Sequence, residues 1–216
     1  MLKILPFTLA LISIIYEFAL AQLISTFHGS TFTVYAICVG IFTCSLGFGS
    51  LAFNHIKSKA PSSLLLLAET LLSVSALLAP FIIVIGTALP LPPYLKYFFV
   101  YSTVFFTGFL SGIELPCLLG LDIKKKEAIL FWDYLGMFIG SLLFGLYALE
   151  LFGPITLLWI LSSLNCVAAI FFSHSKHCPT KSFSTQALLL SILILNQVCI
   201  LNESKITTWF GGLYGF

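Results

Sequence analysis

Four acidic side chains lie within long apolar stretches of this sequence: Glu17, Glu69, Glu114 and Asp133. A carboxylate at the centre of a membrane-spanning helix costs roughly 2.5–3.5 kcal/mol to insert, so such residues usually face the interior of a helix bundle and have a partner there. No Lys or His lies within these stretches, and the chain contains no Arg. The acids are therefore neutral groups hydrogen-bonded to nearby hydroxyls and backbone, or a site that binds a cation or a proton, or residues that face lipid by chance. The first interpretation makes them structural, and the second makes them a cation-binding site.

Three of these acids are predicted to lie at one depth. At a rise of 1.5 Å per residue, Glu69, Glu114 and Asp133 each fall about 9–10 Å from the Lys-rich end of their helices, and Glu17 falls about 20 Å from it. We expect the three to point into the bundle interior, with Glu17 deeper in the same cavity. Helical phase decides whether the side chains converge.

The elements that must position these acids are predicted to be transmembrane helices. Of the 216 residues, 59% are hydrophobic and only 8% are charged, against roughly 25% charged in a soluble domain. A spanning helix needs about 20 mostly apolar residues, and this length places helices at 4–26, 32–53, 63–89, 97–121, 128–150, 154–173 and 185–201. We predict an all-α, polytopic transmembrane bundle of about seven helices. It forms a single transmembrane domain over residues 1–201, followed by a short C-terminal tail at 202–216.

The lysines predict the orientation of this bundle. Eight of the ten fall on one side: Lys3, Lys57, Lys59, Lys124, Lys125, Lys126, Lys176 and Lys181. Because Lys-rich loops stay in the cytoplasm, we expect the N-terminus there and an integral protein of a bacterial inner membrane. A rival interpretation takes the first segment as a signal peptide cleaved after Ala19-Leu20-Ala21. The acidic Glu17 late in its apolar stretch argues against cleavage.

Small residues four apart predict close helix packing, because they let two backbones approach. The glycines expected on such faces are Gly47, Gly108, Gly112, Gly136, Gly140 and Gly145. Residues 40–49 also align with residues 136–145, and Glu17 aligns with Glu114 at nearly the same offset. An offset of three helices reverses orientation in the membrane, so this symmetry predicts a 3+3 inverted repeat plus one helix, as in many transporters.

Other classes of function have less support in the sequence. A net charge of +2 without a cluster of basic and aromatic residues argues against nucleic-acid binding. No HExxH helix and no nucleophile–His–acid set is present. The spacing of His174, His177 and Cys178 could suit a metal, but a solvated loop is the more common explanation. We therefore expect no metal, no cofactor and no catalytic residue.

Four motifs in order along residues 8–200 resemble the membrane domain of membrane-bound spermidine synthases. They are Tyr16–Leu23, Leu46–Ser50, Gly112–Pro116, and Asp133–Gly136 with Gly140–Gly145 behind it. In that family a soluble aminopropyltransferase domain follows the membrane domain. It transfers an aminopropyl group from decarboxylated S-adenosylmethionine to putrescine.

The resemblance implies only the membrane half of such a protein. The sequence has no strand–glycine loop–helix for a nucleoside, and no helix follows Gly211–Gly215 to hold an anion at its N-terminus. We therefore expect a non-catalytic protein in the lipid bilayer that binds or moves a small cation, a polyamine or a proton, through its buried carboxylates. The alternative is a membrane scaffold or anchor for a separately encoded partner such as a soluble aminopropyltransferase.

Overall fold

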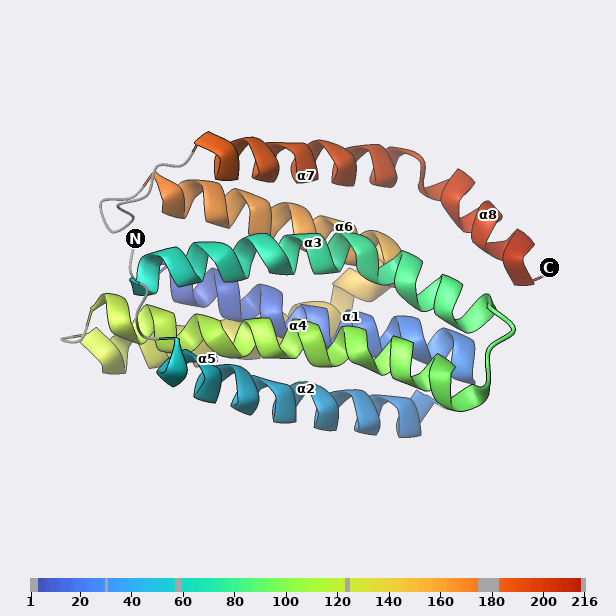
Figure 1. Ribbon diagram of the computed structural model, residues 1–216, viewed down its shortest axis with the longest axis horizontal. Coiled ribbons are helices and arrows are strands. Elements are labelled where there is room, and N and C mark those ends of the chain that lie inside the picture. Colours follow the sequence, from blue (N-terminus) through green and yellow to red (C-terminus); the bar gives the residue numbers. More distant parts are fainter. Residues whose placement is uncertain (1–3, 30, 57–59, 123–124, 175–182, 215–216) are drawn as a thin grey trace.

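The structure is a computed structural model that describes residues 4–29, 31–56, 60–122, 125–174 and 183–214. These residues form helices without a strand, so the predicted all-α class is confirmed. The helices are α1 (Ile4–His28), α2 (Thr31–His55), α3 (Pro61–Ala88), α4 (Pro93–Leu121), α5 (Lys126–Leu143), the π-helix η2 (Phe144–Ala148), α6 (Leu149–Ser173), α7 (Phe183–Leu201) and α8 (Glu203–Tyr214). Figure 1 shows them as one elongated bundle, with α1 to α6 running along its long axis.

The length and hydropathy of these helices suit a lipid bilayer. α1, α2, α3 and α4 are each long and apolar enough to cross one, and so is the 48-residue stretch Lys126–Ser173. This last stretch is two helices, because its backbone leaves the helical region at Gly153 (φ 68°, ψ 166°). Positive φ favours glycine, and Pro154 supplies the fixed φ that suits the first turn of a new helix. The turn falls at the Gly153-Pro154 pair that separates two predicted spans.

The last two helices form a bent pair. α7 continues into α8 with a change of direction of 71°, and the two together are apolar enough for one broken span or a re-entrant segment. Residues 203–214 of the predicted short tail are therefore helical. α8 packs back on the bundle through Phe210, whose ring centroid lies 5.7 Å from that of Phe81 on α3.

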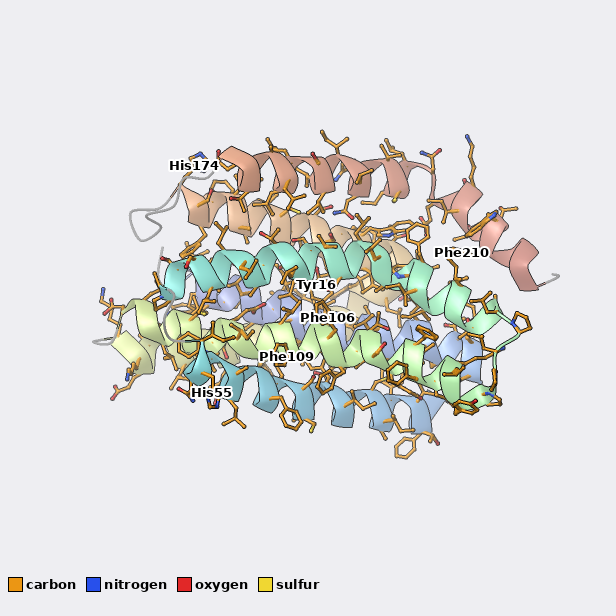
Figure 2. The ribbon with its side chains drawn as sticks, viewed as in Figure 1. Tyr16, His55, Phe106, Phe109, His174 and Phe210 are labelled. Carbon is orange, nitrogen blue, oxygen red and sulfur yellow. The ribbon has the colours of Figure 1, made fainter. Side chains whose placement is uncertain are left out.

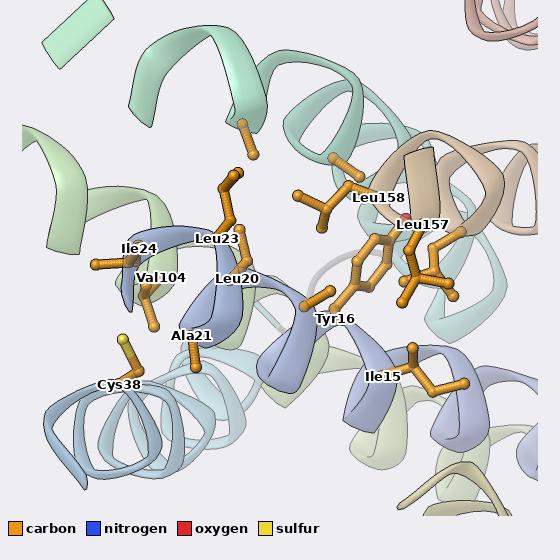
Figure 3. Close-up of a cluster of buried hydrophobic side chains, with 14 of the residues drawn as sticks. Ile15, Tyr16, Leu20, Ala21, Leu23, Ile24, Cys38, Val104, Leu157 and Leu158 are labelled. Atoms are coloured by element: carbon orange, nitrogen blue, oxygen red, sulfur yellow. The ribbon is translucent and has the colours of Figure 1, made fainter. Parts of the chain in front are cut away.

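The first helix, α1, lies at the centre of the bundle. It packs against α2, α3, α4, α5 and α6, and its buried side chains include Tyr16, Leu20 and Ile24. Figure 3 shows Tyr16 directed toward Leu157 and Leu158 of α6, whereas Ala21 faces α2. Removing α1 would expose the core of every helix that packs against it.

Two pairs of helix contacts match the predicted repeat, whereas the contact of α1 with α2 is far more extensive than that of its counterpart, α4 with α5. If α1, α2 and α3 correspond to α4, α5 and α6, the contact of α2 with α4 has its equivalent in that of α5 with α1. The contact of α3 with α4 likewise has its equivalent in that of α6 with α1. The corresponding helices α1 and α4 run in opposite directions along the bundle (Figure 1). This is the arrangement that a 3+3 inverted repeat produces.

Four of the predicted glycines lie where two helices meet. A Cβ at Gly108 would lie 2.9 Å from the Phe42 carbonyl oxygen of α2, and one at Gly112 would contact the backbone of the same helix. Gly136 and Gly140 bring α5 equally close to the backbone of α1. These positions have no room for a side chain.

The other two glycines, Gly47 and Gly145, do not form such contacts, and this corrects their predicted packing role. A Cβ at either position would meet no atom within 4 Å. Gly47 borders a cavity instead of a helix, and Gly145 belongs to η2, where the α-helical phase changes. Small residues spaced four positions apart therefore identify the close helix contacts of α4 and α5, but they do not identify a contact at Gly47 or Gly145.

Candidate functional site

A cavity of about 330 Å³ lies between α1, α2, α4 and α5. Two of the four predicted acids line it: Glu114 from α4 and Asp133 from α5. The rest of its wall is formed by small and apolar residues together with three hydroxyls: Ala10, Ser13, Leu46, Gly47, Ser50, Ser111, Gly112, Leu115, Pro116, Leu119 and Met137. Two carboxylates from different helices therefore share one cavity.

The geometry of α4 around Glu114 supplies further polar atoms. Pro116 lies inside the helix and has no N–H to donate to the carbonyl of Gly112, four residues earlier. Gly112 and Pro116 both line the cavity. The Gly112 carbonyl oxygen thus lacks its usual helical donor at the point where Glu114 enters the same wall.

The hydroxyl of Ser111 is a second unusual feature of this wall. Its oxygen is buried and has no hydrogen-bond partner among the described residues, although Ser111 lines the cavity. Buried polar atoms are normally paired, because leaving one unpaired costs about 1–3 kcal/mol. An occupant of the cavity with an N–H or O–H group could satisfy this oxygen.

Asp133 is positioned by the face of α5 that packs on α1. Asp133, Gly136 and Gly140 are spaced by three and four residues, so they lie on one stripe of the helix. The two glycines contact α1, and only 6% of Asp133 is exposed. The close approach of the two helices therefore holds the carboxylate inside the bundle.

Glu17 lies one turn beyond the cavity. It shares a stripe of α1 with Ala10 and Ser13, which line the wall, and it is 6% exposed. It is close enough to Cys38 of α2 for the two groups to interact electrostatically. Glu17 itself is not part of the wall.

Glu69 lies behind the wall, on α3. It is 1% exposed, and neither carboxylate oxygen has a hydrogen-bond partner among the described residues. It is within electrostatic range of Glu114, and Asp133 is also within range of Glu114. The predicted group of four acids is therefore divided into two that line the cavity and two that lie next to it.

Tyr16 is a further polar residue of this region, and sequence reasoning did not place it with the acids. Its side chain is fully buried, its hydroxyl has no partner in the described part of the chain, and it lies within electrostatic range of both Glu69 and Glu114. Figure 2 shows it at the middle of the bundle. Because a tyrosine in an apolar segment is usually a packing residue, the position of Tyr16 in the sequence does not indicate that it lies near these acids.

A second polar feature joins α3, α6 and α7. Asn196 of α7 donates to the Ser162 hydroxyl (2.8 Å), which in turn donates to the Ser73 carbonyl of α3 (2.6 Å). On the same side of α6, the Trp159 indole donates to the Leu77 carbonyl at 3.3 Å. The sequence analysis did not predict this series of hydrogen bonds, although an asparagine inside an apolar stretch is an indication of interhelical hydrogen bonding.

The described basic residues lie at the two ends of the bundle. Lys125 pairs with Asp122 at 3.6 Å, and Lys96 donates to the Thr87 carbonyl at 2.9 Å. None of these residues lines the cavity. The other lysines of the predicted cytoplasmic side, except Lys126, lie outside the described residues: Lys3, Lys57, Lys59, Lys124, Lys176 and Lys181.

No group of three His, Cys, Asp or Glu side chains that could hold a metal ion occurs among the described residues. His177 and Cys178 of the loop cluster lie outside them. The chemistry of the site is therefore that of carboxylates, hydroxyls and a free carbonyl oxygen. Such a set accepts hydrogen bonds and balances positive charge.

The fold and the site together define a polytopic helical bundle with an acidic cavity at its interior. The chain is 26% identical over 166 residues to a polyamine aminopropyltransferase of Oceanobacillus iheyensis, and 27% identical over 172 residues to polyamine aminopropyltransferase 1 of Streptomyces coelicolor. These matches cover 73% and 76% of this chain but only 32% of each relative. The similarity is consistent with the resemblance to spermidine synthases. No family model matches the chain, and no solved structure matches it.

Proposed function

We propose that this protein binds a small organic cation of the polyamine class in the cavity between α1, α2, α4 and α5. Glu114 and Asp133 provide the negative charge, and Ser111 and the Gly112 carbonyl accept hydrogen bonds from its ammonium groups. The observation that supports this most directly is the shared cavity of the two acids, whose described wall contains no basic residue.

Electrostatics favours a cationic occupant. Two ionised carboxylates in a medium of low dielectric constant repel each other, and each is expensive to bury without a partner. A cation between them removes both penalties. A dication adds a second attractive interaction, and the flexible methylene chain of a polyamine suits the apolar part of the wall, which includes Leu115, Leu119 and Met137.

The comparisons support the same chemical class. Both relatives are named as polyamine aminopropyltransferases, and the matched part of those proteins has the size of this bundle. The inverted packing of the two helix triplets is an arrangement found in transporters, where substrates bind at the interface of the repeats. Movement of the cation across the membrane is therefore part of this proposal.

Thermal unfolding in detergent tests the binding. A ligand at 100 times its dissociation constant stabilises the folded state by about 2.7 kcal/mol, so putrescine or spermidine should raise the melting temperature. The increase should be larger at higher pH, because the carboxylates must be ionised to attract the cation. Glu114→Gln and Asp133→Asn keep the shape of the side chains and should abolish the increase.

Two controls separate binding from a general effect of salt. Glu127→Gln removes an acid that is exposed at the start of α5 and should leave the increase unchanged. The uncharged 1,4-butanediol, which has the carbon chain of putrescine, should not stabilise the protein. Equal stabilisation of the wild type and the Glu114→Gln variant would refute the proposal.

A membrane scaffold is the second candidate, and the coverage of the relatives favours it. This chain matches only 32% of each of them, so in those proteins the matched bundle is joined to a much longer remainder. A bundle that anchors a separate aminopropyltransferase would retain that enzyme in membranes. Co-sedimentation of a soluble aminopropyltransferase from the same organism with membranes that contain this chain tests that role.

A further inference from the structure

We infer that Glu69 and Tyr16 form an interior proton site that is linked to occupancy of the cavity, so that a cation entering beside Glu114 displaces a proton from Glu69. The inference rests on the proposed cation site and adds a coupled ion to it. Neither residue lines the cavity, so the two sites are distinct.

The surroundings of Glu69 provide the first argument. Both of its carboxylate oxygens are buried and have no hydrogen-bond partner in the part of the chain that the structure describes, and an isolated charge in such a place is several kcal/mol less stable than in water. The neutral acid avoids that penalty. Within the described residues no Lys or His contacts it to hold the charged form, so Glu69 carries a proton while the cavity is empty.

The groups that face Glu69 provide the second argument. α4 contributes Glu114 and Cys117, α1 contributes Tyr16, and α6 contributes Cys166, which lies near Ser73 and Tyr16. The titratable groups of α7 and α8 whose side chains are described, which are Cys199, Glu203 and Lys205, lie roughly two helical turns or more further along the bundle. Every close titratable neighbour in the described part of the chain is therefore an acid, a thiol or a phenol, and none supplies positive charge.

A cation in the cavity favours the ionised form of Glu69. Glu114 lines the cavity and is within electrostatic range of Glu69, so positive charge at Glu114 also stabilises a negative charge at Glu69. The O–H bond of the Glu69 carboxyl then breaks, its electron pair remains on the carboxylate, and the proton leaves to the solvent. The hydroxyl of Tyr16 has no hydrogen-bond partner among the described residues, and it is a donor of the kind that the new carboxylate requires.

Calorimetry of spermidine binding to the detergent-solubilised protein tests this linkage. Titrations in two buffers with different enthalpies of protonation give the number of protons released per spermidine. We expect the wild type to release protons and Glu69→Gln to bind spermidine but release fewer, by up to about one proton per spermidine. Glu127→Gln is the exposed control and should match the wild type.

Tyr16→Phe is the second variant, because it retains both the carboxyl of Glu69 and the aromatic ring. Loss of the hydroxyl removes the donor to the ionised Glu69, so its proton release should also fall below that of the wild type. The same proton number in the wild type and in Glu69→Gln would overturn the inference, and so would an unchanged number in Tyr16→Phe if Glu69→Gln does not fold. Absence of spermidine binding by the wild type would instead refute the cation site on which the inference rests.

Discussion

Replacement of Gly136 by alanine should destabilise the bundle, whereas the same replacement at Gly145 should not. A Cβ at Gly136 would lie 3.0 Å from the carbonyl carbon of Phe7 and closer still to its oxygen. These are backbone atoms, so α1 and α5 would have to separate. Overpacking of this kind costs about 1–3 kcal/mol, which exceeds the roughly 0.5–1 kcal/mol that alanine gains over glycine in a helix.

The Gly145→Ala variant is the control for the change in stability at Gly136. A Cβ at Gly145 meets no atom within 4 Å, so only the gain from reduced backbone entropy applies there. For a chain of this size, 1 kcal/mol corresponds to about 2–4 °C in the melting temperature. Thermal unfolding of both variants in the same detergent should therefore show a decrease for Gly136→Ala and no decrease for Gly145→Ala. Equal melting temperatures for the two variants would refute the packing argument for α5.

Three further results are expected. Gly47→Leu should fill the cavity and abolish stabilisation by spermidine while the unliganded protein remains folded, because Gly47 faces open space; thermal unfolding with and without spermidine measures both effects. Ser162→Ala should lower stability by about 0.6–1.7 kcal/mol, the range of interhelical hydrogen bonds in membranes, and Asn196→Ala should add little to it in the double variant, since the two side chains share one chain of hydrogen bonds. A reporter in the 121–127 loop should be cytoplasmic and one after Phe216 should lie on the opposite side, and the same location for both would contradict the predicted number of spans.

Hydropathy was sufficient to predict the helices, because a bilayer imposes both their length and their composition. Even the break near the start of α6 was visible in the sequence, since Gly153 and Pro154 are the residues that such a turn requires. The bend between α7 and α8 was not predicted. Residues 203–214 mix polar and apolar side chains, and their helix packs on the bundle through Phe210 against Phe81.

The depth of the candidate acids along the bundle was predicted from the sequence, but the directions in which their side chains point were predicted only in part. A residue count along each helix places Glu69, Glu114 and Asp133 at similar distances from one end of the bundle. This count does not show which neighbouring helix each acid faces. Asp133 turns inward because it shares a stripe with Gly136 and Gly140, a pattern that was present in the sequence. Glu69 does not line the cavity, and its helix α3 packs against α4 and α6.

The central position of α1 has a consequence for the assembly of the protein. During synthesis α1 is the first of these helices to be made, yet two of its neighbours, α5 and α6, are made about 100 residues later or more. Contacts so distant in sequence form slowly. Until they form, the hydroxyl of Tyr16 lacks the α6 side chains that cover it, so the nascent chain has only the earlier helices α2, α3 and α4 to shield this part of α1.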